Sequence, residues 1–242
     1  QLHPKVKARL KELNDTFSTY QPNSVLSRFN RHYETTWFSV PAEVVKVLAV
    51  AGEVSKLSEG AFDVTVAPLV KLWGFGADKT RPAPSEKELK AVLAQVGYRK
   101  LELRKQPPAL RKQVPQLTVN VSAIAKGYGV DAIAQLLESQ GHRDFIVEIG
   151  GEVRAKGHKP DGSVWRIGVE RPNYKARDLA TVIVLSDTAM ATSGDYRNYR
   201  DVGKRRISHT IDPRTARPIE HNLASVTVIE PSCMRADAWA TA

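Results

Sequence analysis

Cysteine is almost absent from this chain of 242 residues, in which Cys233 is the only one. A single cysteine excludes an internal disulfide and a cysteine-rich zinc site, but it does not settle the redox compartment. We predict that Cys233 is a small buried hydrophobe, because free cysteine is among the most often buried residue types.

Long apolar runs are also missing. No stretch of about 18 apolar residues occurs, so the sequence predicts no transmembrane helix. The N-terminal segment QLHPKVKARLKEL lacks the apolar centre of a signal peptide, although a leader removed before Gln1 would leave no trace. Because the chain opens inside one predicted helix and closes inside another, we expect both termini to be clipped.

Acidic residues are fewer than basic ones, and 36 − 26 gives an excess of 10 positive charges. The excess gathers in residues 99–112 and 197–206, which nucleic acid, an anionic membrane or a phosphate-rich ligand could meet. No helix-turn-helix, zinc-finger, RRM or KH signature accompanies these clusters. We therefore predict no nucleic-acid partner and interpret the clusters as solvated faces and hairpins.

The hydrophobic spacing predicts a mixed fold without repeats or linkers. Helices are expected over residues 4–17, 41–57 and 124–140, with one after Pro84 and one from about residue 233. Ser85 and Glu88 form a capping-box pattern, and residues 63–76 are expected to be irregular. Short strands with polar connections are expected over 99–120, with one that ends at Val121, and further strands over 144–149, 152–156, 164–170, 180–186, 206–211 and 224–230. The later strands lie too close for helical crossovers, which predicts one α+β domain, residues 1–242, with an antiparallel-rich sheet.

The segment ISHTIDPRTARPI, residues 207–219, holds the first candidate catalytic residue. It places His209 on a β-type run that ends at Asp212-Pro213, with Ser208 and Thr210 beside the imidazole. Histidine titrates nearest neutral pH, so its neighbours can prepare it for proton transfer. The alternative is a strand that simply runs into an Asp-Pro turn.

A second candidate is the start of the helix in NVSAIAKGYGVD, residues 120–131. Its first turn offers unpaired N–H groups for a phosphate, and Lys126 would add a positive charge. Gly127 and Gly129 would let a ligand or a strand approach the backbone closely. The spacing matches neither a Walker A loop nor GxGxxG, so a buried glycine-containing helix stays the alternative.

Two further groups suggest a metal and an aromatic ligand. Asp237 and Thr241 are four residues apart, so on a helix they share a face that could hold magnesium; an aspartate that balances the helix dipole is the alternative. The run Gly60 to Asp63 could read the edge of a heterocycle, and Tyr20 could stack on it. Core packing is the alternative for both.

Seven motifs together, in one order, resemble the ApbE family of FAD:protein FMN transferases. They are STYQPNSVLSRFN, GAFDVTVAPLVKLWGFG, SAIAKGYGVD, EIGGEVRAKG, ATSGDYRNY, SHTIDPRTARPIEHN and ADAWAT, and they span nearly the whole chain. The resemblance implies a single ApbE-like, T-fold-related domain. It also implies an enzyme that moves the FMN half of FAD to a threonine hydroxyl of an acceptor protein and releases AMP.

The resemblance also implies roles for individual residues. His209 would be the base for the incoming threonine. Contacts with FAD would come from Tyr20, Ala61, Phe62, Asp63, Asn120, Lys126 and Ile211. Magnesium would be held by the carbonyl of Ala123 and the side chains of Asp237 and Thr241. Members of the family often carry an acidic residue at the positions of Asn120 and Ala240. They also normally have a strand before the first helix, and that strand is not in this chain.

By the same resemblance, the acceptors would be threonine-containing subunits of flavinylated respiratory complexes. The protein would be periplasmic and anchored to the inner membrane as a lipoprotein, through a lipid anchor outside this chain. Two alternatives remain: an FAD pyrophosphatase that yields FMN and AMP, and a non-catalytic flavin-binding lipoprotein. Asp237 and Thr241 argue against the latter.

Overall fold

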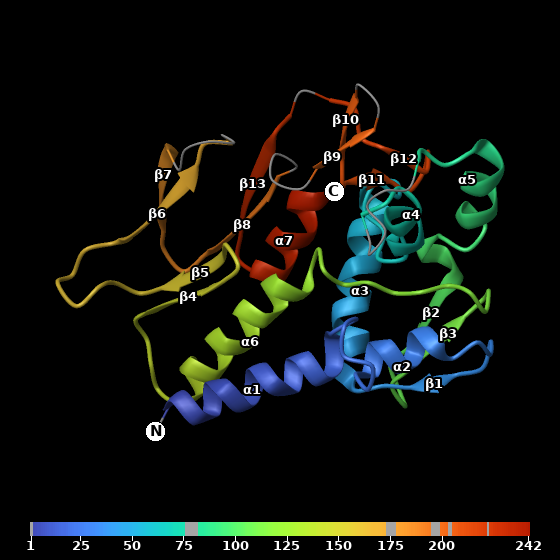
Figure 1. The fold of residues 1–242 in the computed structure, drawn as a ribbon. Helices are drawn as coiled ribbons and strands as arrows, with labels where there is room; N and C mark the ends of the chain where they lie inside the picture. Colours follow the sequence, from blue (N-terminus) through green and yellow to red (C-terminus); the bar gives the residue numbers. More distant parts are fainter. Residues whose placement is uncertain (1, 76–81, 173–177, 195–198, 203–204, 222) are drawn as a thin grey trace. The chain divides into compact units, whose positions relative to one another are not determined.

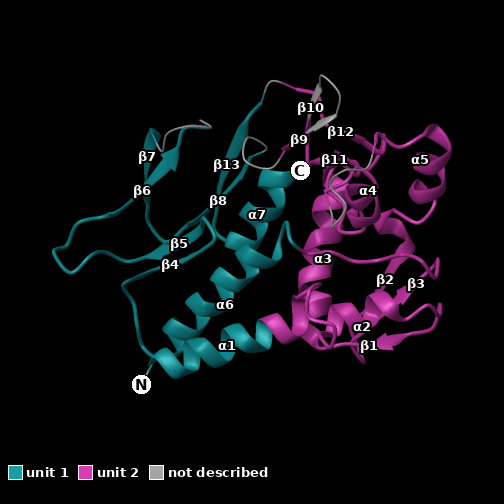
Figure 2. Ribbon diagram, viewed as in Figure 1, with its two compact units in different colours: residues 1–13, 122–197, 223–241 teal, residues 14–121, 198–222, 242 magenta. Residues whose placement is uncertain are grey.

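The computed structural model describes residues 2–75, 82–172, 178–194, 199–202, 205–221 and 223–242 (Figure 1). Contacts divide the chain into two compact units (Figure 2). Unit 1 comprises residues 1–13, 122–197 and 223–241, and unit 2 comprises residues 14–121, 198–222 and 242. Each unit is built from segments far apart in sequence, which explains why no linker is visible in the composition.

Unit 1 is centred on a four-stranded antiparallel sheet in the order β13-β8-β5-β4. Its strands are β4 (Phe145–Ile149), β5 (Glu152–Lys156), β8 (Ala189–Gly194) and β13 (Ser225–Glu230). β6 (Trp165–Glu170) and β7 (Leu179–Leu185) form a separate hairpin. The register pairs Val153 with Met190 and Ser225 with Gly194, so β8 occupies the middle of the sheet.

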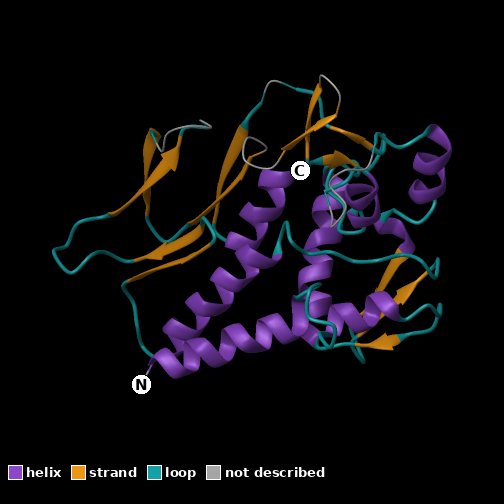
Figure 3. Cartoon of the chain, in the orientation of Figure 1, coloured by secondary structure: helices purple, strands orange, loops and turns teal. Residues whose placement is uncertain are grey.

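Two helices, α6 (Ala125–Ser139) and α7 (Cys233–Thr241), pack together and against this sheet (Figure 3). One apolar cluster joins Val130 and Ile133 of α6 to Phe145 and Val147 of β4 and to Cys233 of α7. The N-terminal part of α1 (Leu2–Phe17) contributes partly buried apolar residues to it. Cys233 is fully buried, as predicted, and burial raises the pKa of its thiol.

Unit 2 is mainly helical. Its helices are α2 (Val25–Arg31), α3 (Ala42–Leu57), α4 (Ala67–Leu72), α5 (Glu86–Leu93) and the short 3₁₀ helix η1 (Tyr98–Lys100). Its strands are β1 (Phe38–Ser39), β2 (Leu101–Arg104), β3 (Ala109–Lys112), β9 (Tyr199–Val202), β10 (Arg205–Ser208), β11 (Ile211–Asp212) and β12 (Arg217–Pro218). They form the sheets β1-β3-β2, β10-β9 and β11-β12. All strand pairs among the described residues are antiparallel, which confirms the predicted α+β class.

Several element predictions are confirmed and several are wrong. The capping box before α5 is present, since Ser85 and Glu88 bond reciprocally. Short α4 and the central strand β8 were missed. The predicted strand up to Val121 forms no ladder, and the backbone N–H of Asn120 instead donates to the carbonyl of Val64 at 2.7 Å.

The basic cluster at residues 99–112 forms the predicted hairpin, but it is not wholly solvated. Lys112 is only 1% exposed, and it donates to the carbonyl of Asn30 at 3.1 Å over the ring of Phe29. Desolvation lowers the pKa of Lys112 to about 8. Several side chains of the basic cluster at residues 197–206 lie outside the described residues. Gly76, the last residue of the segment predicted to be irregular, also lies outside them.

In the part of the chain that the structure describes, no helix combines the length and apolarity needed to cross a bilayer.

Candidate functional site

The predicted site residues fall into two groups, one in each unit. Unit 1 holds Ala123, Lys126, Asp237 and Thr241. Unit 2 holds Tyr20, Ala61, Phe62, Asp63, Asn120, His209 and Ile211.

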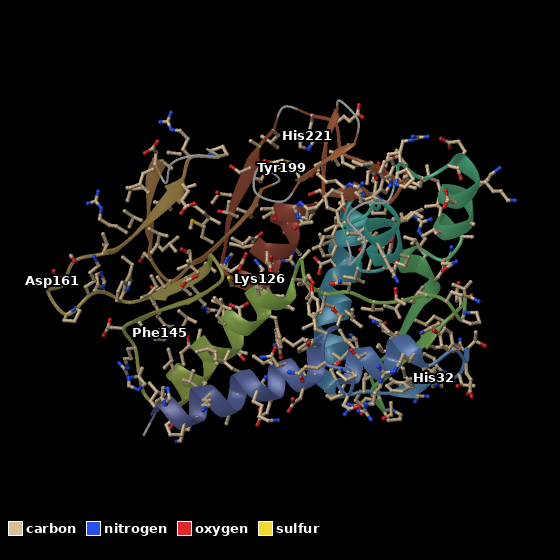
Figure 4. The ribbon with its side chains drawn as sticks, viewed as in Figure 1. His32, Lys126, Phe145, Asp161, Tyr199 and His221 are labelled. Carbon is tan, nitrogen blue, oxygen red and sulfur yellow. The ribbon has the colours of Figure 1, made fainter. Side chains whose placement is uncertain are left out.

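Lys126 lies in the first turn of α6, as predicted (Figure 4). A turn over residues 122–124, which includes Ala123, leads into this helix. The ammonium of Lys126 pairs with Oε1 of Glu152, the first residue of β5, and the lysine side chain is about half exposed. The structure therefore places a positive charge at the positive end of a helix, an arrangement that suits an anion.

Glu152 was not identified from the sequence, and it is the main addition to this group. It is 2% exposed, and its Oε2 has no hydrogen-bond partner among the described residues. Burial is the principal cause that raises the pKa of its carboxyl group, and the bond from Lys126 opposes that rise. The alternation along β5 gave no signal, because it places Glu152 on the same face as the partly exposed Arg154 and Lys156.

Asp237 and Thr241 both lie on α7, as their spacing predicted. The carboxyl of Asp237 is 3% exposed, and its Oδ2 accepts the backbone N–H of Gly127 at 2.9 Å. Burial raises the pKa of Asp237 to about 7. The hydroxyl of Thr241 lies 2.9 Å from that of Ser193 on β8 and 3.5 Å from the carbonyl of Asp237.

α7 is positioned by Asp131, a buried residue of α6. Its carboxylate accepts the backbone N–H groups of Cys233 and Met234 at 3.1 and 3.0 Å and the hydroxyl of Ser232 at 2.8 Å. It also pairs with Arg154 of β5 at 2.7 Å. Asp131 thus caps α7 from another helix and fixes the start of the element that carries Asp237.

These oxygens suit a hard cation. A buried carboxylate, a hydroxyl and the carbonyl at Ala123 are ligand types that Mg²⁺ accepts while it keeps several waters. Groups of three or more His, Cys, Asp or Glu side chains able to hold a metal are absent among the described residues. The donor set therefore fits magnesium and offers no cysteine–histidine site for zinc.

In unit 2, Asp63 follows Ala61 and Phe62 in the sequence and joins its own segment to Tyr98 at the start of η1. Its Oδ1 accepts both the N–H and the hydroxyl of Thr65, and its Oδ2 accepts the N–H of Tyr98 at 2.7 Å. Burial is the largest influence on this carboxyl group and raises its pKa. Phe62 is buried, and the bond from Asn120 to Val64 brings Asn120 next to the same segment.

Tyr20 lies on a loop that is fixed by hydrogen bonds although its side chain is 93% exposed. The Ser18 side chain accepts the backbone N–H groups of Tyr20 and Gln21, while the Ser18 carbonyl accepts the hydroxyl of Ser27 at 3.2 Å. A large aromatic ring held in solvent is not core packing, which excludes that alternative for Tyr20.

His209 is placed differently from the sequence prediction. It lies in a bend between β10 and β11 rather than on one strand, and its ring meets the ring of Phe75 edge-on at 6.2 Å. Asp212 pairs with Arg214 at 2.8 Å, which lowers the pKa of this carboxyl group. Ile211 is buried in an apolar cluster with Leu69 and Trp73.

The comparisons with known proteins agree with one another. A sequence model of the ApbE family matches residues 1–242. A protein of Vibrio cholerae named FAD:protein FMN transferase is 46% identical over 99% of the chain and 72% of its own length. The solved flavin transferase ApbE of that organism superposes with a TM-score of 0.88 at 46% identity, over 99% of this chain and 76% of that one. The apo flavinyl transferase ApbE of Pseudomonas stutzeri has a TM-score of 0.89 at 40% identity, over 99% and 74%.

Proposed function

The chain belongs to the ApbE family, and from that membership we propose that it is an FAD:protein FMN transferase. The observation that carries the proposal is the identity of up to 46% with proteins of that name over nearly the whole chain.

In the proposed reaction, a threonine hydroxyl of the acceptor protein attacks the FMN phosphorus of FAD. A phosphoester bond forms between the threonine oxygen and this phosphorus, and the bond from phosphorus to the bridging oxygen breaks. That oxygen leaves as part of AMP. Charge neutralisation and alignment are the main requirements of such a transfer.

The unit 1 residues would meet the pyrophosphate. Magnesium would be held by the carbonyl of Ala123, the carboxylate of Asp237 and the hydroxyl of Thr241, and it would neutralise phosphate charge. Lys126 would add a further positive charge from the start of α6. Asp131, through its cap on α7, keeps the Asp237 side chain in place for this task.

The unit 2 residues would meet the flavin and the acceptor. Tyr20 would stack on the isoalloxazine, and Ala61, Phe62, Asp63, Asn120 and Ile211 would line its pocket. His209 would take the proton of the incoming threonine, a role that typically contributes about 10²–10⁴-fold in rate.

Mass spectrometry of a threonine-containing acceptor domain, incubated with the protein, FAD and Mg²⁺, tests the proposal. We expect a mass increase that matches phosphoester-linked FMN and disappears when EDTA is added. If FAD instead yields free FMN and AMP while the acceptor mass is unchanged, the pyrophosphatase alternative replaces the proposal.

We further propose that the acceptors are subunits of flavinylated respiratory complexes. We also propose a periplasmic location on the inner membrane, reached through a lipid anchor outside this chain. Both proposals rest on the family resemblance of the sequence motifs. Fractionation of cells that express the full-length protein, with detection in the membrane and periplasmic fractions, tests the location.

A further inference from the structure

Three ion pairs join α6 to β5, and two of them, Asp131–Arg154 and Lys126–Glu152, differ in how completely their carboxylates are satisfied. Asp131 receives Arg154, two backbone N–H groups and a serine hydroxyl. Glu152 receives Lys126 on Oε1 alone, and its Oε2 has no partner among the described residues. In the Asp131–Arg154 pair, both carboxylate oxygens accept hydrogen bonds. In the Glu152–Lys126 pair, the buried Oε2 of Glu152 accepts none from the described residues.

An unused carboxylate oxygen in the interior is costly for the folded protein. A buried acceptor without a donor typically costs about 1–3 kcal/mol, and more when it is charged. Native proteins rarely keep such a group unless a ligand, ion or water completes it. Oε2 of Glu152 is therefore open to a hydrogen-bond donor or a cation that the described residues do not provide.

Glu152 is linked to Asp237 through two consecutive residues of α6. Lys126 contacts Glu152, and the next residue, Gly127, donates its backbone N–H to Asp237. With both carboxyl groups ionised, the charges of Glu152, Asp237 and Lys126 sum to −1 − 1 + 1 = −1. The two carboxyl groups are buried, whereas the lysine side chain is about half exposed, so this net negative charge favours a cation as its missing partner.

We propose that Glu152 is a further residue of the cation site at Asp237, and that its Oε2 accepts a hydrogen bond from water in the hydration shell of a divalent cation. This inference rests on the metal part of the proposed function. Magnesium retains several of its waters in proteins, so a carboxylate beside the direct ligands can hold one of them. Lys126 partly cancels the charge of Glu152 and thereby moderates the affinity.

The charges beside Asp237 set the sign of their effect on a cation. The carboxylate of Glu152 attracts a cation at Asp237, whereas the ammonium of Lys126, which pairs with Glu152, repels it. Removal of Glu152 should therefore weaken cation binding, and removal of Lys126 should strengthen it.

The test is calorimetric titration of the metal-free protein with Mg²⁺ and with Mn²⁺, without FAD. We expect Glu152→Gln to raise the cation Kd about tenfold or more, as is typical when a group that supports the direct ligands is removed. Lys126→Met should lower the Kd. Asp161→Asn is the control, because Asp161 is an exposed carboxylate of the same unit, on the loop between β5 and β6, and the Kd of this variant should change less than about twofold.

The outcomes separate this inference from the proposed function. If the wild-type protein and Asp237→Asn bind the cation equally, the magnesium site of the proposed function is wrong and this inference falls with it. If Asp237→Asn loses binding while Glu152→Gln keeps the wild-type Kd, only the inference is overturned. Should Glu152→Gln fail to fold, Lys126→Met decides, because an unchanged or higher Kd in that variant contradicts the proposed charge balance.

Discussion

The backbone N–H of Gly127 donates to Oδ2 of Asp237 at 2.9 Å, and this bond requires an unusually close approach of α6 and α7. A Cβ atom on Gly127 would lie 2.3 Å from the carbonyl oxygen of Cys233 and 2.8 Å from the Cβ of Asp237. Residue 127 must therefore be glycine for the two helices to meet. The close neighbour is the backbone of a helix, not a ligand or a strand as the sequence suggested.

Gly127→Ala should separate α6 from α7, because its Cβ would overlap backbone atoms that cannot rotate away. We expect a loss of at least about 1–3 kcal/mol in the free energy of unfolding, as for other overpacked sites. Cation binding should weaken as well, since Asp237 would lose its N–H donor. Urea denaturation and calorimetric titration with Mg²⁺ measure the two effects.

Gly129→Ala is the control for that variant, two residues further along α6. Its Cβ would meet only the end of the Ile149 side chain, at 3.4 Å. Because alanine favours the helix over glycine by about 1 kcal/mol, this variant should be as stable as the wild type or more so. Equal destabilisation by both substitutions would contradict the steric account of Gly127.

Thr241→Val tests the hydroxyl at the end of α7. If the Thr241 oxygen binds the cation, its O–H group must point away from the cation. It can then donate a hydrogen bond to the oxygen of Ser193, which lies 2.9 Å away. We expect Thr241→Val to raise the Mg²⁺ Kd about tenfold and Ser193→Ala to raise it less, because Ser193 only orients the hydroxyl. A wild-type Kd in Thr241→Val would remove Thr241 from the metal ligands.

Lys112 predicts a pH dependence of stability. Its pKa is lowered to about 8 in the folded protein, so between pH 8 and 10.5 the unfolded chain binds the proton that the folded one has released. The free energy of unfolding should therefore rise with pH across this window, by up to about 1.4 kcal/mol per pH unit from this group.

The comparison with Lys112→Met isolates that contribution, since methionine does not titrate. The difference in unfolding free energy between wild type and Lys112→Met should change between pH 8 and 10.5 and stay constant from pH 6 to 7. Lys105→Met, at an exposed lysine of the same hairpin, serves as the control. A difference independent of pH would show that burial does not perturb Lys112.

The sequence predicted those parts of the site that depend on local spacing. Asp237 and Thr241 lie one turn apart on α7, and Lys126 lies in the first turn of α6, because helix periodicity and end signals are local properties. The bend at His209 was not predicted, since the alternation over residues 206–211 reads as one strand. Its interruption comes from pairing, because β10 joins β9 while β11 joins β12.

Glu152 shows the limit of such reasoning. A glutamate after two glycines indicates a polar turn, and nothing nearby in the sequence signals a lysine 26 residues earlier as its partner. Only the antiparallel register of β4 with β5 and the packing of α6 on this sheet create the pair. Strand β8 was missed for a similar reason. Its small residues Ala189 and Ala191 are buried against the neighbouring elements, and alanine gives no strong strand signal in the sequence.

His209→Ala tests the proposed base directly. If His209 accepts the threonine proton, its removal should lower the transfer rate about 10²–10⁴-fold and leave the Kd for FAD nearly unchanged. The pH–rate profile should lose the limb that reports deprotonation of the imidazole. Single-turnover transfer to the acceptor, followed by mass spectrometry, and flavin fluorescence titration provide the two readouts.

Phe75→Leu is the companion variant, because Phe75 meets the His209 ring edge-on and has no proton to exchange. It should slow transfer only modestly, by misplacing the imidazole, and retain the pH profile of the wild type. An undiminished rate in His209→Ala would exclude the base role. A rate loss accompanied by an equal loss of FAD affinity would instead assign His209 to ligand binding.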